Sequence, residues 1–138
     1  MKLILDTNVL VSGIFFGGVP GQILAAWADE RVSLVLSPAI LDEYARVGAE
    51  LATKYVERRA AMFAVLDVIT VNATIVNATP LITRVSADPA DDVFLAAAMS
   101  SDTRLIVSGD RHLLDVSGWQ EIVVVKPRDF LHRFLRES

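Results

Sequence analysis

Acidic residues follow two apolar segments that have the character of buried strands. Asp6 comes directly after the apolar run 3–5, and Asp110 follows the run 105–107 and Ser108-Gly109. The carboxyl ends of parallel strands meet at one edge of a sheet, so we expect Asp6 and Asp110 to lie together. Carboxylates gathered in one cleft repel each other unless a cation holds them. Because oxygen ligands suit Mg²⁺ or Mn²⁺, the pattern predicts metal-assisted chemistry on a phosphate.

Three further acids, Asp88, Asp91 and Asp92, open an alanine-rich segment. Asp88 is placed to cap a helix and Asp91 stands at a capping-box position, and all three favour the helix dipole. The segment 93–99 is apolar on every face, so the helix must be buried and its acidic start must point into a confined place. We expect at least one of these acids to serve the site; Asp88 and Asp92, four apart, share a face.

Glu43 is the remaining acid with an unusual setting. Its neighbours Tyr44 and Val47 belong to the apolar stripe of a predicted helix, so Glu43 lies in or beside that stripe. A carboxylate on the buried face of a helix needs a group that compensates its charge, and a cation shared with other acids would provide this. Asp42, by contrast, has Arg46 four residues later and is predicted to form a solvated ion pair.

The elements that would position these acids alternate along the chain. Apolar or β-branched runs predict strands at 2–6, 32–36, 68–76, 105–107 and 122–125, and helices are predicted at 21–30, 37–47, 52–66, 88–100 and 127–136. This alternation is typical of an α/β fold whose mainly parallel sheet is covered on both faces. The glycine-rich segment 13–21 matches neither phosphate-loop template and is predicted to be a mobile turn beside the site.

Composition narrows the class of protein. The 138 residues suffice for one domain, 1–138, and 53% apolar residues support a sizeable core. The absence of cysteine excludes disulfides and thiolate chemistry, and His112 and His132 are not spaced for a zinc site, so both are predicted to be bystanders. A net charge of −4 argues against a broad basic surface for nucleic acid.

The stretch 7–28 carries no charged residue and has about the length of a membrane span. It is interrupted by five helix-disfavouring residues, Gly13, Gly17, Gly18, Pro20 and Gly21. Asp6 also precedes it, which is unlike a signal peptide. We therefore expect no membrane association and a cytoplasmic location.

Together these motifs resemble those of the PIN-domain nucleases, and most of all the VapC-like toxins of bacterial toxin–antitoxin pairs. The resemblance rests on Leu-Asp-Thr-Asn-Val-Leu-Val-Ser-Gly at the start, an acid in the second long helix, Asp-Pro-x-Asp-Asp before a buried helix, and Val-Ser-Gly-Asp near the end. The order is that of the family, and the resemblance spans nearly the whole chain.

The resemblance implies an α/β/α sandwich that cleaves RNA with Mg²⁺ or Mn²⁺, is inhibited by a small antitoxin protein, and forms a homodimer or larger assembly. The implied catalytic and metal-binding acids are Asp6, Glu43, Asp92 and Asp110. Asn8 and Ser108 would support them. Relatives often carry asparagine at the position of Asp92 and keep the preceding aspartate, so Asp91 shares or takes that role as the alternative.

Basic residues are needed to hold the RNA backbone. The candidates are Arg46, Lys54, Arg58 and Arg59 on neighbouring predicted helices, and Arg104 and Arg111 near the last acidic motif. Apolar positions of the predicted C-terminal helix, such as Phe130 and Phe134, are candidates for an antitoxin or dimer contact.

Other functions fit less well. A phosphoacceptor receiver domain would need paired acids after the first strand, whereas this chain has only Asp6 there. It would also need an aspartate at the end of a middle strand, whereas the run 32–36 is followed by Ser37. Lys126-Pro127 is the one feature that suits a receiver domain. A haloacid-dehalogenase-type phosphatase needs acid-x-acid, whereas this chain has Asp6-Thr7-Asn8. An inactive PIN-like module that binds RNA or protein is the third alternative.

Overall fold

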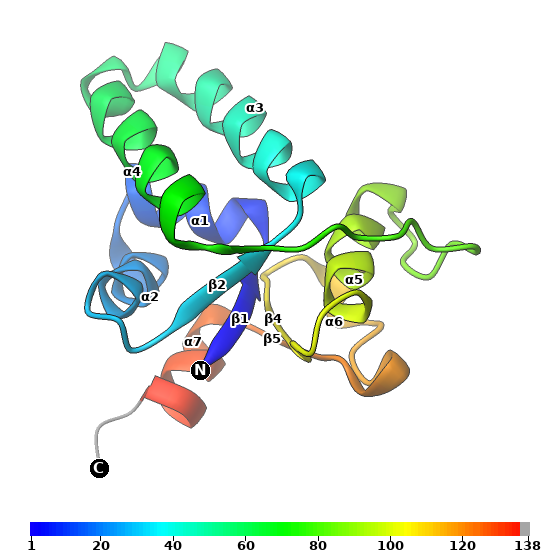
Figure 1. Ribbon diagram of the computed structural model, residues 1–138. Helices are drawn as coiled ribbons and strands as arrows, with labels where there is room; N and C mark the ends of the chain where they lie inside the picture. Colours follow the sequence, from blue (N-terminus) through cyan, green and yellow to red (C-terminus); the bar gives the residue numbers. More distant parts are fainter. Residues whose placement is uncertain (136–138) are drawn as a thin grey trace.

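A computed structural model describes residues 1–135 of the chain (Figure 1). Its strands are β1 (Lys2–Leu5), β2 (Ser33–Leu36), β3 (Thr74–Ile75), β4 (Leu105–Val107) and β5 (Val123–Val125). Its α-helices are α1 (Thr7–Phe15), α2 (Gly18–Ala28), α3 (Pro38–Lys54), α4 (Arg59–Asn72), α5 (Asp92–Met99), α6 (Arg111–Leu114) and α7 (Pro127–Phe130). Short helical turns are η1 (Val56–Arg58), η2 (Pro89–Asp91), η3 (Trp119–Glu121) and η4 (Leu131–Leu135).

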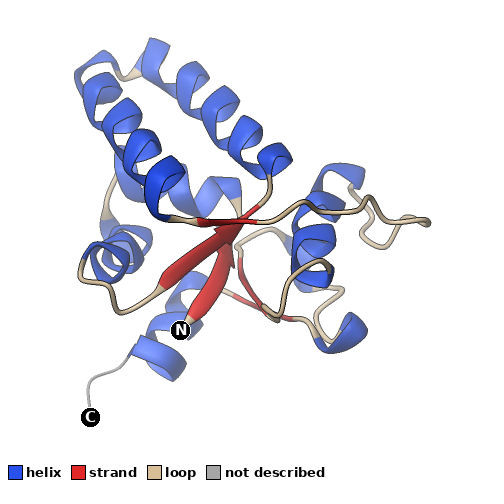
Figure 2. Ribbon diagram, viewed as in Figure 1, coloured by secondary structure: helices blue, strands red, loops and turns tan. Residues whose placement is uncertain are grey.

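The five strands form one parallel sheet in the order β3-β2-β1-β4-β5 (Figure 2). Strand β1 is central, with Leu3 paired to Leu34 on β2 and Ile4 paired to Ile106 on β4. The predicted α/β class is therefore confirmed. The strand order also excludes a receiver domain, whose order is 2-1-3-4-5.

Helices cover both faces of this sheet. Helix α5 packs against β2 and β4, while α1 contacts α2, α3 and α4. Figure 1 shows α5 on the opposite side of the sheet from α1 and α2. As predicted, α5 is buried on nearly all sides, with Phe94 to Ala98 inside the core. The α/β/α arrangement thus brings the start of α5 beside the carboxyl ends of β1 and β4.

The glycine-rich segment is helical, and the prediction of a mobile turn was wrong. Helices α1 and α2 meet at a sharp bend of 94°, where Gly17 and Gly18 adopt positive φ angles of 75° and 63°. Gly13 lies inside α1, where the close approach of α2 leaves no room for a side chain. A Cβ atom at this position would lie 2.6 Å from the Leu24 Cδ1 atom. Glycine at 13 therefore serves helix packing, which a single sequence does not distinguish from turn formation.

Within residues 1–135, no single helix is long and apolar enough to cross a membrane. The bent pair of α1 and α2 passes that test only when both helices are taken together, by length and composition.

Three element boundaries also differ from those predicted. Helix α3 continues to Lys54, α4 starts at Arg59, and α4 extends through the β-branched stretch to Asn72, leaving only Thr74–Ile75 as a strand. Burial of Ile69 and Met62 against the core outweighs the β preference of the valines and isoleucines around them. The predicted end of the last helix at Arg136 lies outside the described residues.

Candidate metal centre

The ends of β1 and β4 are joined through a buried hydroxyl group. Ser108 is fully buried, and its hydroxyl donates a hydrogen bond to Asp6 Oδ2 at 2.6 Å. The Ser108 Oγ atom in turn accepts a hydrogen bond from the Asp110 backbone N–H at 2.9 Å. The Asp6 N–H donates to the Val107 carbonyl at 3.0 Å, which extends the sheet register by one residue. Asp6 and Asp110, 104 positions apart in the chain, therefore meet as the strand-end rule predicts.

Helix α3 fixes the same strand end from another side. The hydroxyl of the fully buried Tyr44 donates to the carbonyl of Leu5, directly before Asp6. Burial, and then the charge of Asp6, raise the pKa of Tyr44, so its phenol stays a neutral donor. Asp6 itself is 5% exposed. Burial raises the pKa of Asp6, and the nearby Asp110 charge adds to this, whereas the Ser108 hydrogen bond and the Thr7 and Asn8 amides oppose it.

The turn η2 brings two more carboxylates to this place. Ligand atoms of Asp88, Asp91, Asp110 and His112 all lie within 4.8 Å of one another. Burial raises the pKa of Asp91 to about 7, assisted by the charge of Asp110, by a hydrogen bond shared with Asp110, and by the charges of Asp6 and Asp88. We call Asp6, Asp88, Asp91 and Asp110 the acidic site.

Local hydrogen bonds hold these side chains in place. The Asp88 carboxylate accepts the Ala90 N–H at 3.0 Å, as a helix cap, and the Ser86 hydroxyl donates to Asp91 Oδ2 at 3.3 Å. Asp110 Oδ1 accepts the His112 N–H at 2.8 Å and therefore caps α6. The predicted capping by Asp88 is confirmed, and Asp88 also belongs to the acidic site.

His112 was predicted to be a bystander, but the structure places it against the acidic site. Its Nδ1 atom lies 3.7 Å from Asp110 Oδ1. The histidine comes two residues after Asp110, in the first turn of α6, so the capping hydrogen bond brings its ring near the carboxylate. That short spacing was the signal in the sequence, and a search for paired histidines could not detect it.

Asp92 points elsewhere. Its two carboxylate oxygens accept the backbone N–H groups of Val85 and Ser86, at 3.0 and 2.8 Å. Asp92 thus closes the loop before η2, while its neighbour Asp91 faces Asp110. Of the two aspartates that the sequence left open, the structure brings Asp91 into the acidic site.

This geometry predicts a structural effect of losing Asp92. We expect Asp92→Ala to lower the free energy of unfolding by about 1–2 kcal/mol, because two loop N–H groups lose their acceptor. Chemical denaturation of the metal-free protein measures this. The control is Asp42→Ala, since Asp42 is exposed on α3 and has no such role. Equal stability of the Asp92→Ala variant and the parent would show that water replaces the carboxylate at no cost.

Glu43 and Asn8 are the remaining residues that the sequence assigned to the site. The Glu43 carboxylate accepts a hydrogen bond from the Arg46 guanidinium at 2.7 Å, and its side chain is 32% exposed. Arg46 also pairs with Glu50 at 2.9 Å, so the predicted pair of Asp42 and Arg46 is replaced by a pair of Arg46 with two glutamates. Asn8 is exposed, and its contribution to Asp6 is its backbone N–H.

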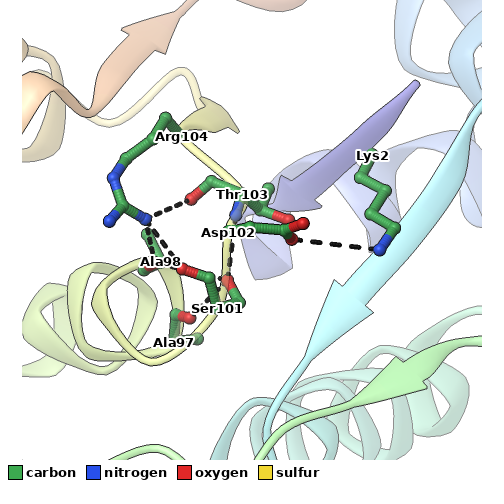
Figure 3. A network of polar contacts seen from close by, with 7 residues as sticks. All are labelled: Lys2, Ala97, Ala98, Ser101, Asp102, Thr103 and Arg104. Carbon is green, nitrogen blue, oxygen red and sulfur yellow. Dashed lines mark hydrogen bonds and ion pairs between the residues drawn. The ribbon is translucent and has the colours of Figure 1, made fainter.

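Most of the basic candidates are engaged with the protein. Arg58 donates twice to the Ile14 carbonyl, at 3.1 and 2.7 Å, and Arg59 lies over the Phe63 ring. Lys54 lies over the Tyr55 ring. Figure 3 shows Arg104 donating to the carbonyls of Ala98, Ser101 and Thr103, beyond the end of α5. Arg111 alone of the predicted set directly adjoins the acidic site, as the exposed residue after Asp110.

The donor chemistry of the acidic site fits a hard divalent cation. Its ligand atoms are carboxylate oxygens, which suit Mg²⁺ and Mn²⁺, with one imidazole nearby. Within residues 1–135, none of the groups that shift the pKa of Asp6 or Asp91 is a cationic side chain. The raised pKa of Asp91 is the expected response of crowded carboxylates that have no cation to neutralise them.

These features define an α/β protein with an acidic site at the carboxyl edge of its sheet. The family model of the PIN domain matches residues 2–112, and the chain therefore belongs to the PIN-domain family.

Two comparisons extend this assignment. The chain is 24% identical over 144 aligned residues to the uncharacterized protein MJ1680 of Methanocaldococcus jannaschii, covering 97% of this chain and 92% of that protein. The fold is similar to a chain in the crystal structure of VapBC2 from Rickettsia felis bound to a DNA fragment from their promoter. The TM-score is 0.60 at 13% sequence identity, over 91% of this chain and 98% of that one.

Proposed function

We propose that this protein is a divalent-metal-dependent endoribonuclease and the toxin of a toxin–antitoxin pair. The observation that carries the proposal is the meeting of Asp6, Asp91 and Asp110 from three separate elements, with a pKa of about 7 for Asp91. Members of the PIN-domain family are typically nucleases, which supports hydrolysis of a phosphodiester bond. The fold likeness to VapBC2 supports a toxin with an antitoxin partner.

In this proposal Asp6, Asp88, Asp91 and Asp110 hold Mg²⁺ or Mn²⁺. When bound, such an ion lowers the pKa of water and offsets the negative charge that develops on the phosphate. Ser108 orients Asp6, and the amide of His112 orients Asp110. Asp92, which the sequence favoured as a ligand, keeps the loop before η2 closed, and Asp91 takes the ligand position. Glu43 as a ligand stays a prediction, because it would first have to leave Arg46.

Two side chains beside the acidic site complete the proposed mechanism. The imidazole of His112 is exposed and adjacent to Asp110, so it is placed to accept the proton that the attacking water loses. Arg111 reaches outward from the same turn and would contact the RNA backbone. The other candidates, among them Arg46, Arg58 and Arg59, would have to give up their present partners to do so. Hydrolysis by water requires no covalent intermediate with the protein.

The experiment is RNA degradation by the purified protein with EDTA, Mg²⁺ or Mn²⁺. We expect cleavage only with the divalent ions, and we expect expression in a bacterial cytoplasm to slow growth unless the small protein encoded beside it is co-expressed. Gel filtration tests the proposed homodimer. RNA binding without cleavage, over a panel of RNAs and both ions, would instead support the inactive RNA-binding module. Unchanged growth at high expression would contradict the toxin role.

A further inference from the structure

A cavity of about 310 Å³ lies on the far side of the turn that carries the acidic site. Its walls come from the start of α3, the loop 76–88 and the start of α5, and they are mostly aliphatic, with Ala39, Leu81 and Val93 among them. Figure 1 shows that loop running from the end of β3 past the N-terminal end of α5. The volume is at the lower end of the range for small-molecule sites, so it suits one planar ring system.

The cavity lies next to the turn η2, which also carries part of the acidic site. Pro89 and Asp92 line it, while Asp88 and Asp91, in the same turn, face Asp110. A single 3₁₀ turn, about 6 Å long, therefore separates the two. A substrate whose phosphate lay at the acidic site would have an adjoining group within reach of the cavity.

The charges of the cavity favour a neutral ligand. Arg84 is its only cationic lining residue and Asp92 its only anionic one among the described residues. Arg84 is exposed and makes no hydrogen bond or ion pair with residues 1–135. The Asp92 oxygens each accept one loop amide and keep further acceptor capacity. A phosphate at this place would meet a carboxylate, whereas a neutral ring with both donors and acceptors would satisfy both side chains.

We propose that this cavity binds an unpaired nucleobase next to the scissile phosphate, and that guanine is the preferred base. This proposal rests on the proposed function as a ribonuclease. The aliphatic walls offer apolar surfaces against which the faces of a base can pack. Guanine presents O6 and N7 acceptors that match a guanidinium fork, and N1 and N2 donors that match a carboxylate. Leu81, Val93 and Arg84 are therefore specificity residues, distinct from the acids that hold the cation.

The first test measures binding without catalysis. Guanosine 5′-monophosphate and ribose 5-phosphate are titrated separately into the whole protein in EDTA, and the methyl NMR signals of Ala39, Val93 and Ala96 are followed. We expect saturable shifts with the nucleotide only. We expect Arg84→Ala, and Ala39→Phe, which fills the cavity from an exposed helix position, to weaken binding about tenfold. No saturable shift, or equal shifts with the sugar phosphate, would overturn the proposal.

Matched variants control for charge and bulk. Arg133→Ala removes an exposed arginine that stacks on Phe134, away from the cavity, and Ala45→Phe adds the same ring to an exposed site on α3. Both are expected to bind like the parent, and equal melting temperatures show that all variants fold.

The second test maps cleavage of single-stranded oligonucleotides. We expect the parent to cut next to guanine, and the two cavity variants to lose this preference about tenfold while the two controls keep it. If the parent cuts RNA and the cavity variants keep its preference, the base site is wrong and the ribonuclease proposal stands. If the nucleotide binds in the cavity but no RNA is cut, the ribonuclease proposal fails and the base site stands.

Discussion

Asp6→Asn is expected to lower the rate of RNA cleavage by about 10³-fold, or about 4 kcal/mol in activation free energy. Asp6 is the most buried carboxylate of the acidic site together with Asp91, each 5% exposed, and it lies at the end of the central strand. An amide has nearly the same shape and can still accept the Ser108 hydroxyl, but it removes the negative charge that a cation requires. The measurement is the initial rate with Mn²⁺ on a fluorescently labelled RNA.

Stability separates this loss from misfolding. Because burial opposes the charged form of Asp6, we expect the metal-free Asp6→Asn variant to melt at the parent temperature or above it. The control is Asp67→Asn, since Asp67 is exposed on α4 and its loss should leave the rate unchanged. If the Asp6→Asn variant cuts as fast as the parent, a contaminating nuclease is responsible for the activity and the acidic site has no part in it.

The metal-free protein is expected to lose about 3 kcal/mol of stability as the pH rises from 4 to 7. The pKa of Asp91 is raised from 3.8 to about 7 in the folded state. Below pH 4 both states hold the proton, and between pH 4 and 7 the unfolded state releases it while the folded state retains it. The folded state therefore binds more protons in this window, so its stability falls as pH rises. The raised pKa of Asp6 acts in the same direction.

A divalent cation should reverse this loss. At pH 7.5 an ion at about 100 times its dissociation constant would add about 2.7 kcal/mol and raise the melting temperature by about 5–10 °C. At pH 5 the rise should be smaller, because protons compete for the same carboxylates. Thermal melts in EDTA and in Mn²⁺ across this pH range give both quantities.

The Asp91→Asn variant tests the assignment to that residue. It should flatten the pH dependence in EDTA and remove most of the rise with Mn²⁺, whereas Asp42→Asn on the exposed side of α3 should change neither. A parent protein that gains stability from pH 5 to 7.5 in EDTA would contradict the raised pKa of Asp91.

The parts of the fold that were predictable are those in which local composition and tertiary packing agree. The run 105–107 is apolar throughout and becomes the buried strand β4, and Ser37-Pro38 starts α3 with the Ser37 hydroxyl accepting the Ile40 N–H at 3.3 Å. The stretch 68–76 was mispredicted because the preference of β-branched residues for strands is weak and tertiary packing can override it. Here Ile69 is buried in the core beside α3, as part of helix α4.

The acidic site shows the same division. Asp6, Ser108 and Asp110 were predictable because the strand-end rule depends on topology, which alternation of elements reveals. The choice between Asp91 and Asp92 was not predictable, because both stand at the start of one helix and both favour its dipole. Only the path of the loop 76–88 shows that Asp92 is occupied by the Val85 and Ser86 amides.

The amino-acid sequence by itself determined that this chain forms a parallel α/β sheet with carboxylates at one edge, because hydrophobic periodicity and strand-end positions are local properties of a chain. The tertiary structure alone decided which carboxylates lie close enough to raise the pKa of Asp91, that His112 joins them, and that Arg46 and Arg58 are engaged by neighbouring groups. The physical reason is that hydrogen bonds and charge interactions act over a few ångströms, so their partners depend on which distant segments folding brings together.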